Sequence, residues 1–106
     1  MTNKELATLL SAKVFNEGEE REIQSWYVGD LLSFVMGNAP QGAGWFTIMS
    51  NVNVLAVATL IDCACVILCE GVQPDESLIN RAKQQDVCLL GVPTPIYETI
   101  SSILKK

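Results

Sequence analysis

The second half of the chain alternates between short apolar runs and longer segments whose apolar residues recur at helical spacing. This pattern predicts strands at residues 45–49, 63–69 and 87–92, and helices at residues 52–62, 74–86 and 95–106. Strands that alternate with helices are typical of parallel sheets, because right-handed crossovers place the connecting helices on the sheet faces. The pattern therefore predicts an α/β fold with βαβ crossovers and a mainly parallel sheet.

The first half of the chain is less regular. Thr2 and Glu5 have the spacing of a capping box, which predicts a helix near the N-terminus. Short strands are predicted at residues 12–15 and 23–28, separated by a charged segment that we expect to be a solvated loop.

A further helix is predicted at residues 31–37, with Asp30 as its N-cap and Gly37 at its end, followed by a loop over residues 38–44. A chain of 106 residues that is 49% hydrophobic can bury one core. We therefore expect a single compact domain spanning residues 1–106, with helices on the faces of its sheet.

Charge and composition exclude several classes of function. The formal net charge is −5 and only seven residues are Lys or Arg, so we expect no nucleic-acid partner. The N-terminus does not have the pattern of a secretory signal, and Asn53, Thr59 and Asp62 interrupt the longest apolar run, so we expect a cytoplasmic protein without membrane insertion.

Four cysteines, Cys63, Cys65, Cys69 and Cys88, could suggest a metal site. A C-x-C pair in an extended strand is poorly arranged to surround a tetrahedral ion, and we expect residues 63, 65, 67 and 69 to share one face of the strand. Buried cysteine also packs as a small apolar side chain. The favoured interpretation is therefore four reduced thiols in the core, with no metal site and no cofactor.

The carboxyl ends of the predicted parallel strands are the candidate ligand site, because ligands of open α/β sheets bind at this edge. Each candidate also has a structural explanation: Ser50 or Asn51 can cap a helix, Gly71 permits a turn, and Thr94 can cap the last helix. The six predicted ligand-binding residues are Ser50, Asn51, Asn53, Glu70, Gly71 and Thr94.

No motif for catalysis is present in the sequence. The chain has no histidine and no phosphate-binding loop, so nucleophile–histidine pairs and nucleotide hydrolysis lack their usual groups. Asp30, Asp62 and Glu70 could act as acids or bases only if the fold brought them together. Asp30 and Asp62 are better explained as a helix cap and a turn residue, and we therefore expect no enzymatic activity and assign no catalytic residue.

The segment "YVGDLLSFVMGNA" and the segment from "WFTIMSNVNV" to "VPTPIYE" resemble the small stand-alone DRTGG-domain proteins, relatives of the N-terminal domain of HPr kinase/phosphorylase. The resemblance runs from Tyr27 to the end of the chain. It implies a compact α/β domain that acts as a regulatory or ligand-sensing module. It also implies an accessory role beside hydrogenase-type or other redox complexes.

The chain departs from the two motifs that give this family its name. It has "SNV" at residues 50–52 in place of "GDR", and "CEG" at residues 69–71 in place of "TGG". The arginine fork that would hold a phosphate is missing, so the altered site suits a polar uncharged or cationic group better than a phosphate.

Two functional hypotheses follow from these patterns. The first is a non-enzymatic regulatory or ligand-sensing module, a homo-oligomer and specifically a homodimer, that acts on a small-molecule ligand or on a redox or metabolic enzyme complex. The alternative is a purely structural protein–protein interaction subunit without a small-molecule ligand. Its docking surface would include Trp26, Tyr27 and Phe34, for which ordinary core packing is the favoured explanation.

Overall fold

The computed structural model describes residues 1–105, which form five strands and five helices. In chain order these are α1 (Asn3–Leu10), β1 (Lys13–Asn16), β2 (Ser25–Val28), α2 (Leu32–Asn38), β3 (Ala43–Thr47), α3 (Asn53–Leu60), β4 (Cys65–Leu68), α4 (Glu76–Gln85), β5 (Leu89–Gly91) and α5 (Ile96–Leu104).

The strands form one sheet in the order β1-β5-β4-β3-β2. Strands β2, β3, β4 and β5 run parallel to one another, whereas the edge strand β1 runs antiparallel to β5, with Lys13 opposite Gly91. This arrangement confirms the predicted fold class, a compact α/β domain with a mainly parallel sheet.

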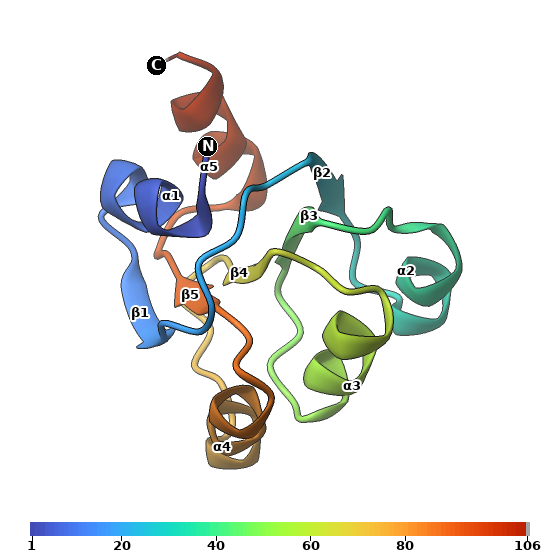
Figure 1. Cartoon of the computed structure of the whole chain (residues 1–106). Helices are drawn as coiled ribbons and strands as arrows, with labels where there is room; N and C mark the ends of the chain where they lie inside the picture. The colour runs from blue at the N-terminus through green and yellow to red at the C-terminus, as the bar shows by residue number, and fades with distance from the viewer. Residues whose placement is uncertain (106) are drawn as a thin grey trace.

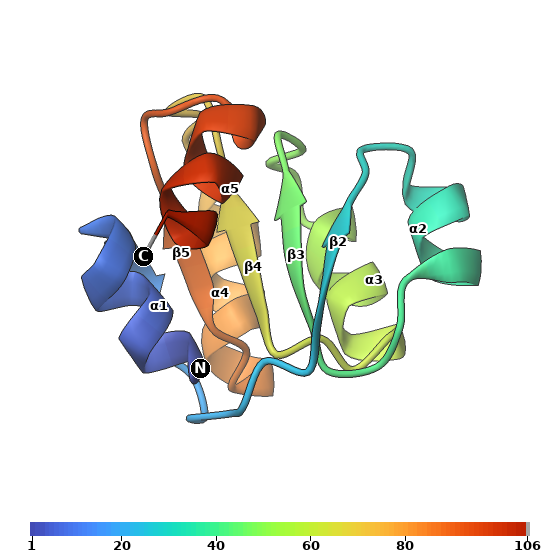
Figure 2. The ribbon, with the colours of Figure 1, turned by 90° about the horizontal axis from the view of Figure 1, so that it is seen from above.

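Helices cover the two faces of the sheet unequally. Figure 1 shows α3 and α4 on one face and α1 and α5 on the other, with α2 beside the β2 edge. Seen from above, α1 and α5 lie over the β5 and β4 side of the sheet, and no helix lies over β2 and β3 (Figure 2). One part of this second face is therefore uncovered.

Side chains alternate between two hydrophobic clusters along the central strands. Trp45, Val66 and Leu89 belong to the cluster beneath α3 and α4. Phe46, Ile67 and Leu90 belong to the cluster on the α1 and α5 face. Since both faces of β3, β4 and β5 are buried, these strands appear in the sequence as continuous apolar runs.

The first predicted helix cap is confirmed, and two others are wrong. The Thr2 and Glu5 side chains form both bonds of a capping box. Asp30 does not cap α2, which begins after Leu31 without a side-chain cap. Thr94 does not cap α5, because Pro95 is its N-cap residue and the Thr94 hydroxyl is bonded elsewhere.

Three local expectations also require correction. Strand β3 begins within the predicted loop at Ala43, and the ring of Trp26 packs over Gly44 so closely that a Cβ there would lie 2.8 Å from a ring carbon. Gly37 lies inside α2 and does not end it. Cys63 packs in the opposite cluster from Cys65 and Cys69, because β4 begins only at Cys65 and strand alternation does not reach residue 63.

Candidate functional site

The loops that follow β3, β4 and β5 are joined to one another by backbone hydrogen bonds at the carboxyl edge of the sheet. The Asp75 amide donates to the Ser50 carbonyl over 2.9 Å, and the Glu70 amide donates to the Thr94 carbonyl over 2.9 Å. The Gly71 amide donates to the Val92 carbonyl, also over 2.9 Å. Four of the predicted site residues, Ser50, Glu70, Gly71 and Thr94, therefore belong to one interlocked set of loops.

Two consecutive residues in the middle loop have left-handed backbone conformations. Glu70 has φ 63° and Gly71 has φ 69°. Glycine adopts this conformation freely, but a glutamate pays a steric cost for it. The hydrogen bonds from the Glu70 and Gly71 amides hold this turn in place, and Glu70 is exposed to solvent. An exposed carboxylate on a constrained backbone is a feature that occurs at binding sites.

The side chains of the other candidates have structural partners. The side-chain carbonyl oxygen of Asn51 accepts from the Asn53 amide over 2.9 Å, which satisfies one free donor at the start of α3. The prediction that Ser50 or Asn51 caps this helix is nevertheless wrong, because the N-cap residue of α3 is Val52, which has no side-chain cap. Asn53 lines an open apolar groove of about 450 Å³ between α2 and α3, away from the cavity that Gly71 lines.

Thr94 is tied to a buried threonine of α5. The hydroxyls of Thr94 and Thr99 lie 2.6 Å apart, and the Thr99 hydroxyl donates to the Pro95 carbonyl over 2.8 Å. Thr99 is almost completely buried. Thr94 thus connects the loop after β5 to the first turn of α5.

A cavity of about 210 Å³ opens next to the Glu70–Gly71 turn. Gly71, Gln73 and Pro93 line it from the carboxyl-edge loops, and Lys13 and Phe15 line it from β1. The Lys13 ammonium lies 5.1 Å from the centroid of the Phe15 ring. Sequence reasoning did not find Lys13 and Phe15, because only the antiparallel pairing of β1 with β5 brings them to this edge.

Several acidic side chains lie along the carboxyl edge of the sheet, where Lys13 is the cation that lines the cavity. Asp30 follows β2 and accepts from the Thr47 hydroxyl over 2.7 Å and from the Ile48 amide over 2.9 Å. Glu70 follows β4, and Asp75 lies at the start of α4. This excess of carboxylates favours neutral or cationic groups over phosphates.

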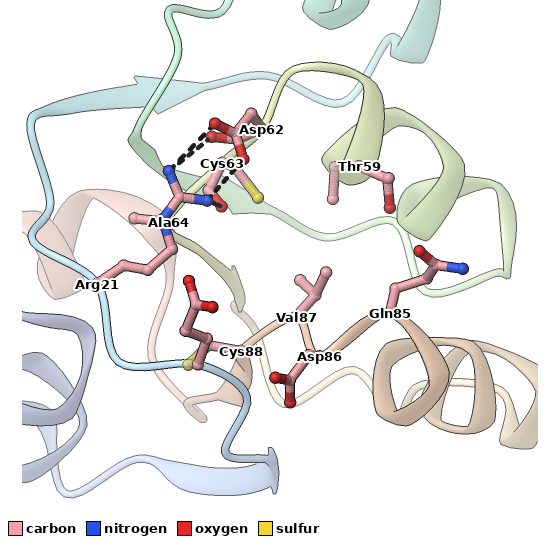
Figure 3. A pocket seen from close by; sticks show the side chains of 11 residues that line it. Arg21, Thr59, Asp62, Cys63, Ala64, Gln85, Asp86, Val87 and Cys88 are labelled. Carbon is pink, nitrogen blue, oxygen red and sulfur yellow. Dashed lines mark hydrogen bonds and ion pairs between the residues drawn. The ribbon is translucent and has the colours of Figure 1, made fainter.

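The opposite edge of the sheet holds a second pocket, of about 160 Å³, which Figure 3 shows from close by. Arg21 of the charged segment donates to the Asp62 carboxylate over 2.8 Å and to the Cys63 carbonyl over 3.0 Å. Gln41 donates to the other Asp62 oxygen over 2.9 Å. The Gln41 amide and the Arg21 guanidinium lower the pKa of Asp62.

Asp62 has a left-handed backbone, with φ 53°, in the predicted turn between α3 and β4. It therefore lies before β4, whereas Glu70 follows this strand, so the two carboxylates are at opposite edges of the sheet. The charged segment is tied to the sheet by Arg21 and is not simply solvated.

Two searches of residues 1–105 gave negative results. No group of three or more cysteine or carboxylate side chains is positioned to hold a metal ion. Within the same residues, every helix is too short or too polar to cross a bilayer. The four cysteines are free and buried, as predicted.

Comparison with solved structures identifies a protein of the same fold. The chain superposes on part of a structure of the CBS and DRTGG domains of the regulatory region of Clostridium perfringens pyrophosphatase, complexed with the activator diadenosine tetraphosphate, with a TM-score of 0.80. The alignment covers 97% of this chain and 46% of that one, at 14% sequence identity. This chain thus spans slightly less than half of the pyrophosphatase region, and the likeness establishes the fold.

Comparison with curated protein sequences found no match. The family profile of the DRTGG domain, in contrast, matches residues 5–105, which includes both the interlocked loops and the antiparallel edge strand. The chain therefore belongs to the DRTGG domain family.

Proposed function

We propose that this chain is a non-enzymatic regulatory module that binds a small molecule at the carboxyl edge of its sheet. The observation that carries this proposal is the constrained turn at Glu70 and Gly71, which adjoins the 210 Å³ cavity. The turn supplies an exposed carboxylate, and the cavity supplies the Phe15 ring and the Lys13 ammonium.

Family membership and the solved relative support a regulatory role. The relative is the regulatory region of an enzyme and was solved with an activator. A domain of the same fold that carries no phosphate loop and no histidine is suited to sensing a ligand rather than to transforming it.

The proposed ligand carries a polar uncharged or cationic group. Asp30, Glu70 and Asp75 give this edge an excess of negative charge, and the arginine of the family motif is absent from the turn. Ser50, Asn51 and Thr94 contribute neutral hydrogen-bonding groups to the same set of loops, and the remaining proposed binding residue, Asn53, lies in the groove between α2 and α3.

Calorimetric titration with two probes tests the site and the charge of its ligand. Adenosine presents a flat, uncharged polar base, and diadenosine tetraphosphate presents the same base with phosphates. We expect adenosine to bind detectably and diadenosine tetraphosphate to bind more weakly than adenosine, because the carboxylates repel its phosphates. Micromolar binding of diadenosine tetraphosphate would contradict the proposed ligand class.

Paired variants test the location of the site. Glu70→Gln should weaken adenosine binding several-fold, whereas Glu20→Gln makes the same change of charge at an exposed position in the segment before β2 and should leave binding unchanged. Equal binding by wild type and both variants would contradict the assignment to the carboxyl edge. If neither probe binds and the chain still assembles with a partner, the alternative of a purely structural subunit is favoured.

We also propose that the chain forms a homodimer and serves a redox or metabolic enzyme complex in the cytoplasm. Three exposed apolar side chains, Trp26, Val28 and Ile48, support self-association or docking. Tyr27 is half-buried against the other face, so the three aromatic residues predicted as one docking surface do not share a face. Light scattering of the purified chain tests the dimer, and capture of the tagged protein from its native cell tests the complex.

The relation to the N-terminal domain of HPr kinase/phosphorylase is part of this proposal. It rests on the order and spacing of the segments that resemble that family. The cytoplasmic location is consistent with four free, buried cysteines, because disulfides are rare in reducing compartments.

A further inference from the structure

Two of the four cysteines lie side by side on neighbouring strands. Val66 is paired with Leu89 in the register of β4 and β5, so the preceding residues, Cys65 and Cys88, are also opposite one another. The Val66 amide donates to the Cys88 carbonyl over 2.9 Å, which extends the ladder to this position. Neighbouring strands are about 4.8 Å apart. This spacing lies within the Cα separations of about 4.4–6.8 Å that a disulfide can bridge.

The two thiols differ in their chemical environment. Cys65 is fully buried, and its interaction with the neighbouring Cys88 thiol, together with burial, raises the pKa of Cys65 well above its ordinary value. The same interaction lowers the pKa of Cys88, although burial acts in the opposite direction.

Cys88 also borders two cavities. It lines the 160 Å³ pocket at the opposite edge of the sheet (the amino-edge pocket), where Figure 3 labels it next to Val87, and it lines a further cavity of about 260 Å³, whereas Cys65 lines neither. Asn3 and Ala7 of α1 and Val14 of β1 form other parts of the second cavity. A small molecule in either cavity can therefore approach Cys88, although this residue is only 4% exposed.

The remaining cysteines have raised pKa values. Burial raises the pKa of Cys63 to about 12, although Cys63 lines the same amino-edge pocket as Cys88. Burial also raises the pKa of Cys69 to about 11, against the opposing effect of its contact with Thr99. Neither has a neighbouring thiol that lowers its pKa.

We propose that Cys88 is an oxidant-sensitive modification site and that Cys65 is its resolving partner, so that a hydroperoxide converts the pair into a disulfide between β4 and the segment entering β5. This property is separate from ligand binding at the carboxyl edge. It gives the module a second input at the other end of the same two strands.

The reaction balances with one hydroperoxide per pair. The Cys88 thiolate attacks one oxygen of hydrogen peroxide, an S–O bond forms as the O–O bond breaks, and the released hydroxide takes up a proton to give water. The Cys65 sulfur then attacks the Cys88 sulfur, the S–S bond forms and the S–O bond breaks. The departing hydroxide takes the Cys65 proton, so two thiols are oxidised and the peroxide is reduced to two waters.

Mass spectrometry of the intact folded chain tests this proposal. After treatment with hydrogen peroxide and alkylation of the remaining thiols, we expect a chain that has lost two hydrogens and carries two alkyl groups, with the disulfide mapped to Cys65 and Cys88. Mapping to another pair, or a chain with four alkylated thiols, would overturn the proposal.

Three variants and one condition sharpen the test. Cys88→Ser should slow oxidation at least tenfold, and Cys65→Ser should accumulate a sulfenic acid at Cys88 that dimedone captures. The control Cys63→Ser should oxidise like wild type, and equal loss in all three variants would contradict the proposal. Circular dichroism confirms that each variant is folded.

In the wild type, brief alkylation should modify Cys88 first, a preference that should disappear in urea. A first modification at any other cysteine of the folded chain would overturn the proposal.

Discussion

Glycine is required at some positions of this chain and costs stability at others. Gly18 has φ 65°, and a Cβ at this position would lie 2.4 Å from the Cys88 amide nitrogen. Gly37 lies within α2, and a Cβ there would meet nothing within 4 Å. The two positions form a matched pair for the substitution of glycine by alanine.

Gly18→Ala should destabilise the fold by about 2 kcal/mol or more, because it combines an unfavourable φ with a backbone clash. Gly37→Ala should instead stabilise it by about 0.5–1 kcal/mol, since alanine is the better helix former. Urea denaturation of both variants measures these free energies. Similar values for the two would contradict the role of Gly18 in the contact with the segment before β5.

The Ser25 hydroxyl is a buried polar group without a hydrogen-bond partner among the described residues. Such a group costs about 1–3 kcal/mol relative to its solvated state. We therefore expect Ser25→Ala to raise the free energy of unfolding by about 1 kcal/mol. Ser33→Ala, at an exposed position in α2, is the control and should change it little. A loss of stability in Ser25→Ala would mean that the hydroxyl has a partner in solution.

Side-chain hydrogen bonds were predictable where both partners are close in sequence. The capping box at Thr2 and Glu5 was found because both of its bonds span three residues. Asp30 and Thr94 were assigned as caps for the same local reason, but Asp30 bonds to Thr47 on a neighbouring strand and Thr94 bonds to Thr99. No local pattern distinguishes these alternatives, because a polar residue before a helix is compatible with both.

At the scale of elements, the Arg21–Asp62 pair fastens the segment before β2 to the turn between α3 and β4. The Gln41 hydrogen bond and the Arg21 pair depress the pKa of Asp62, so these interactions contribute stability above the unfolded pKa of 3.8. The contribution is lost as pH falls through the lower pKa of the folded state. Because the Asp62 side chain is exposed, this contribution to the free energy of unfolding is only about 0.2–1 kcal/mol.

Asp62→Asn should therefore destabilise the chain at pH 7 but not at a pH below the folded pKa of Asp62. Urea denaturation of wild type and variant across this pH range measures the difference. Arg21→Ala and the double variant complete a double-mutant cycle, which isolates the coupling between the two side chains. A coupling that is zero at pH 7, or one that grows in acid, would contradict this assignment.

The sequence pattern identified the elements of the regular half because β3, β4 and β5, buried on both faces, form short continuous apolar runs, and the segments between them have helical spacing. It did not reveal the direction of β1, since antiparallel and parallel edge strands have the same short pattern. This omission concealed part of the candidate site, because Lys13 and Phe15 reach the cavity only through the antiparallel pairing. The carboxyl-edge loops were located correctly because their place follows from the parallel order of β3, β4 and β5.

At the scale of the whole molecule, the two tryptophans report on different environments. Trp45 is fully buried, and its indole nitrogen donates to the Gly29 carbonyl over 2.9 Å. Trp26 is 42% exposed and contacts the Phe46 ring, with a centroid separation of 5.6 Å, on the part of the sheet that no helix covers.

Acrylamide should therefore quench Trp26 several-fold more strongly than Trp45. Trp45→Phe leaves Trp26 as the only indole, and Trp26→Phe provides the converse control. If the proposed homodimer uses the uncovered part of the sheet, quenching of Trp26 should decrease as protein concentration rises, while that of Trp45 stays constant. Quenching of Trp26 that is independent of concentration, in a chain that light scattering finds to be dimeric, would place the dimer interface on another surface.

The position of β1 has a consequence for synthesis on the ribosome. Lys13 emerges well before Gly91, with which it pairs, so β1 must wait until β5 has been translated. At about 5–20 residues per second, this wait lasts several seconds. The nascent chain can assemble β2, β3 and β4 during that time, while β1 exposes both of its edges. The register shift between Val14 and Asn16 belongs to the β1–β5 ladder, so β1 is open to pairing with another chain until β5 arrives.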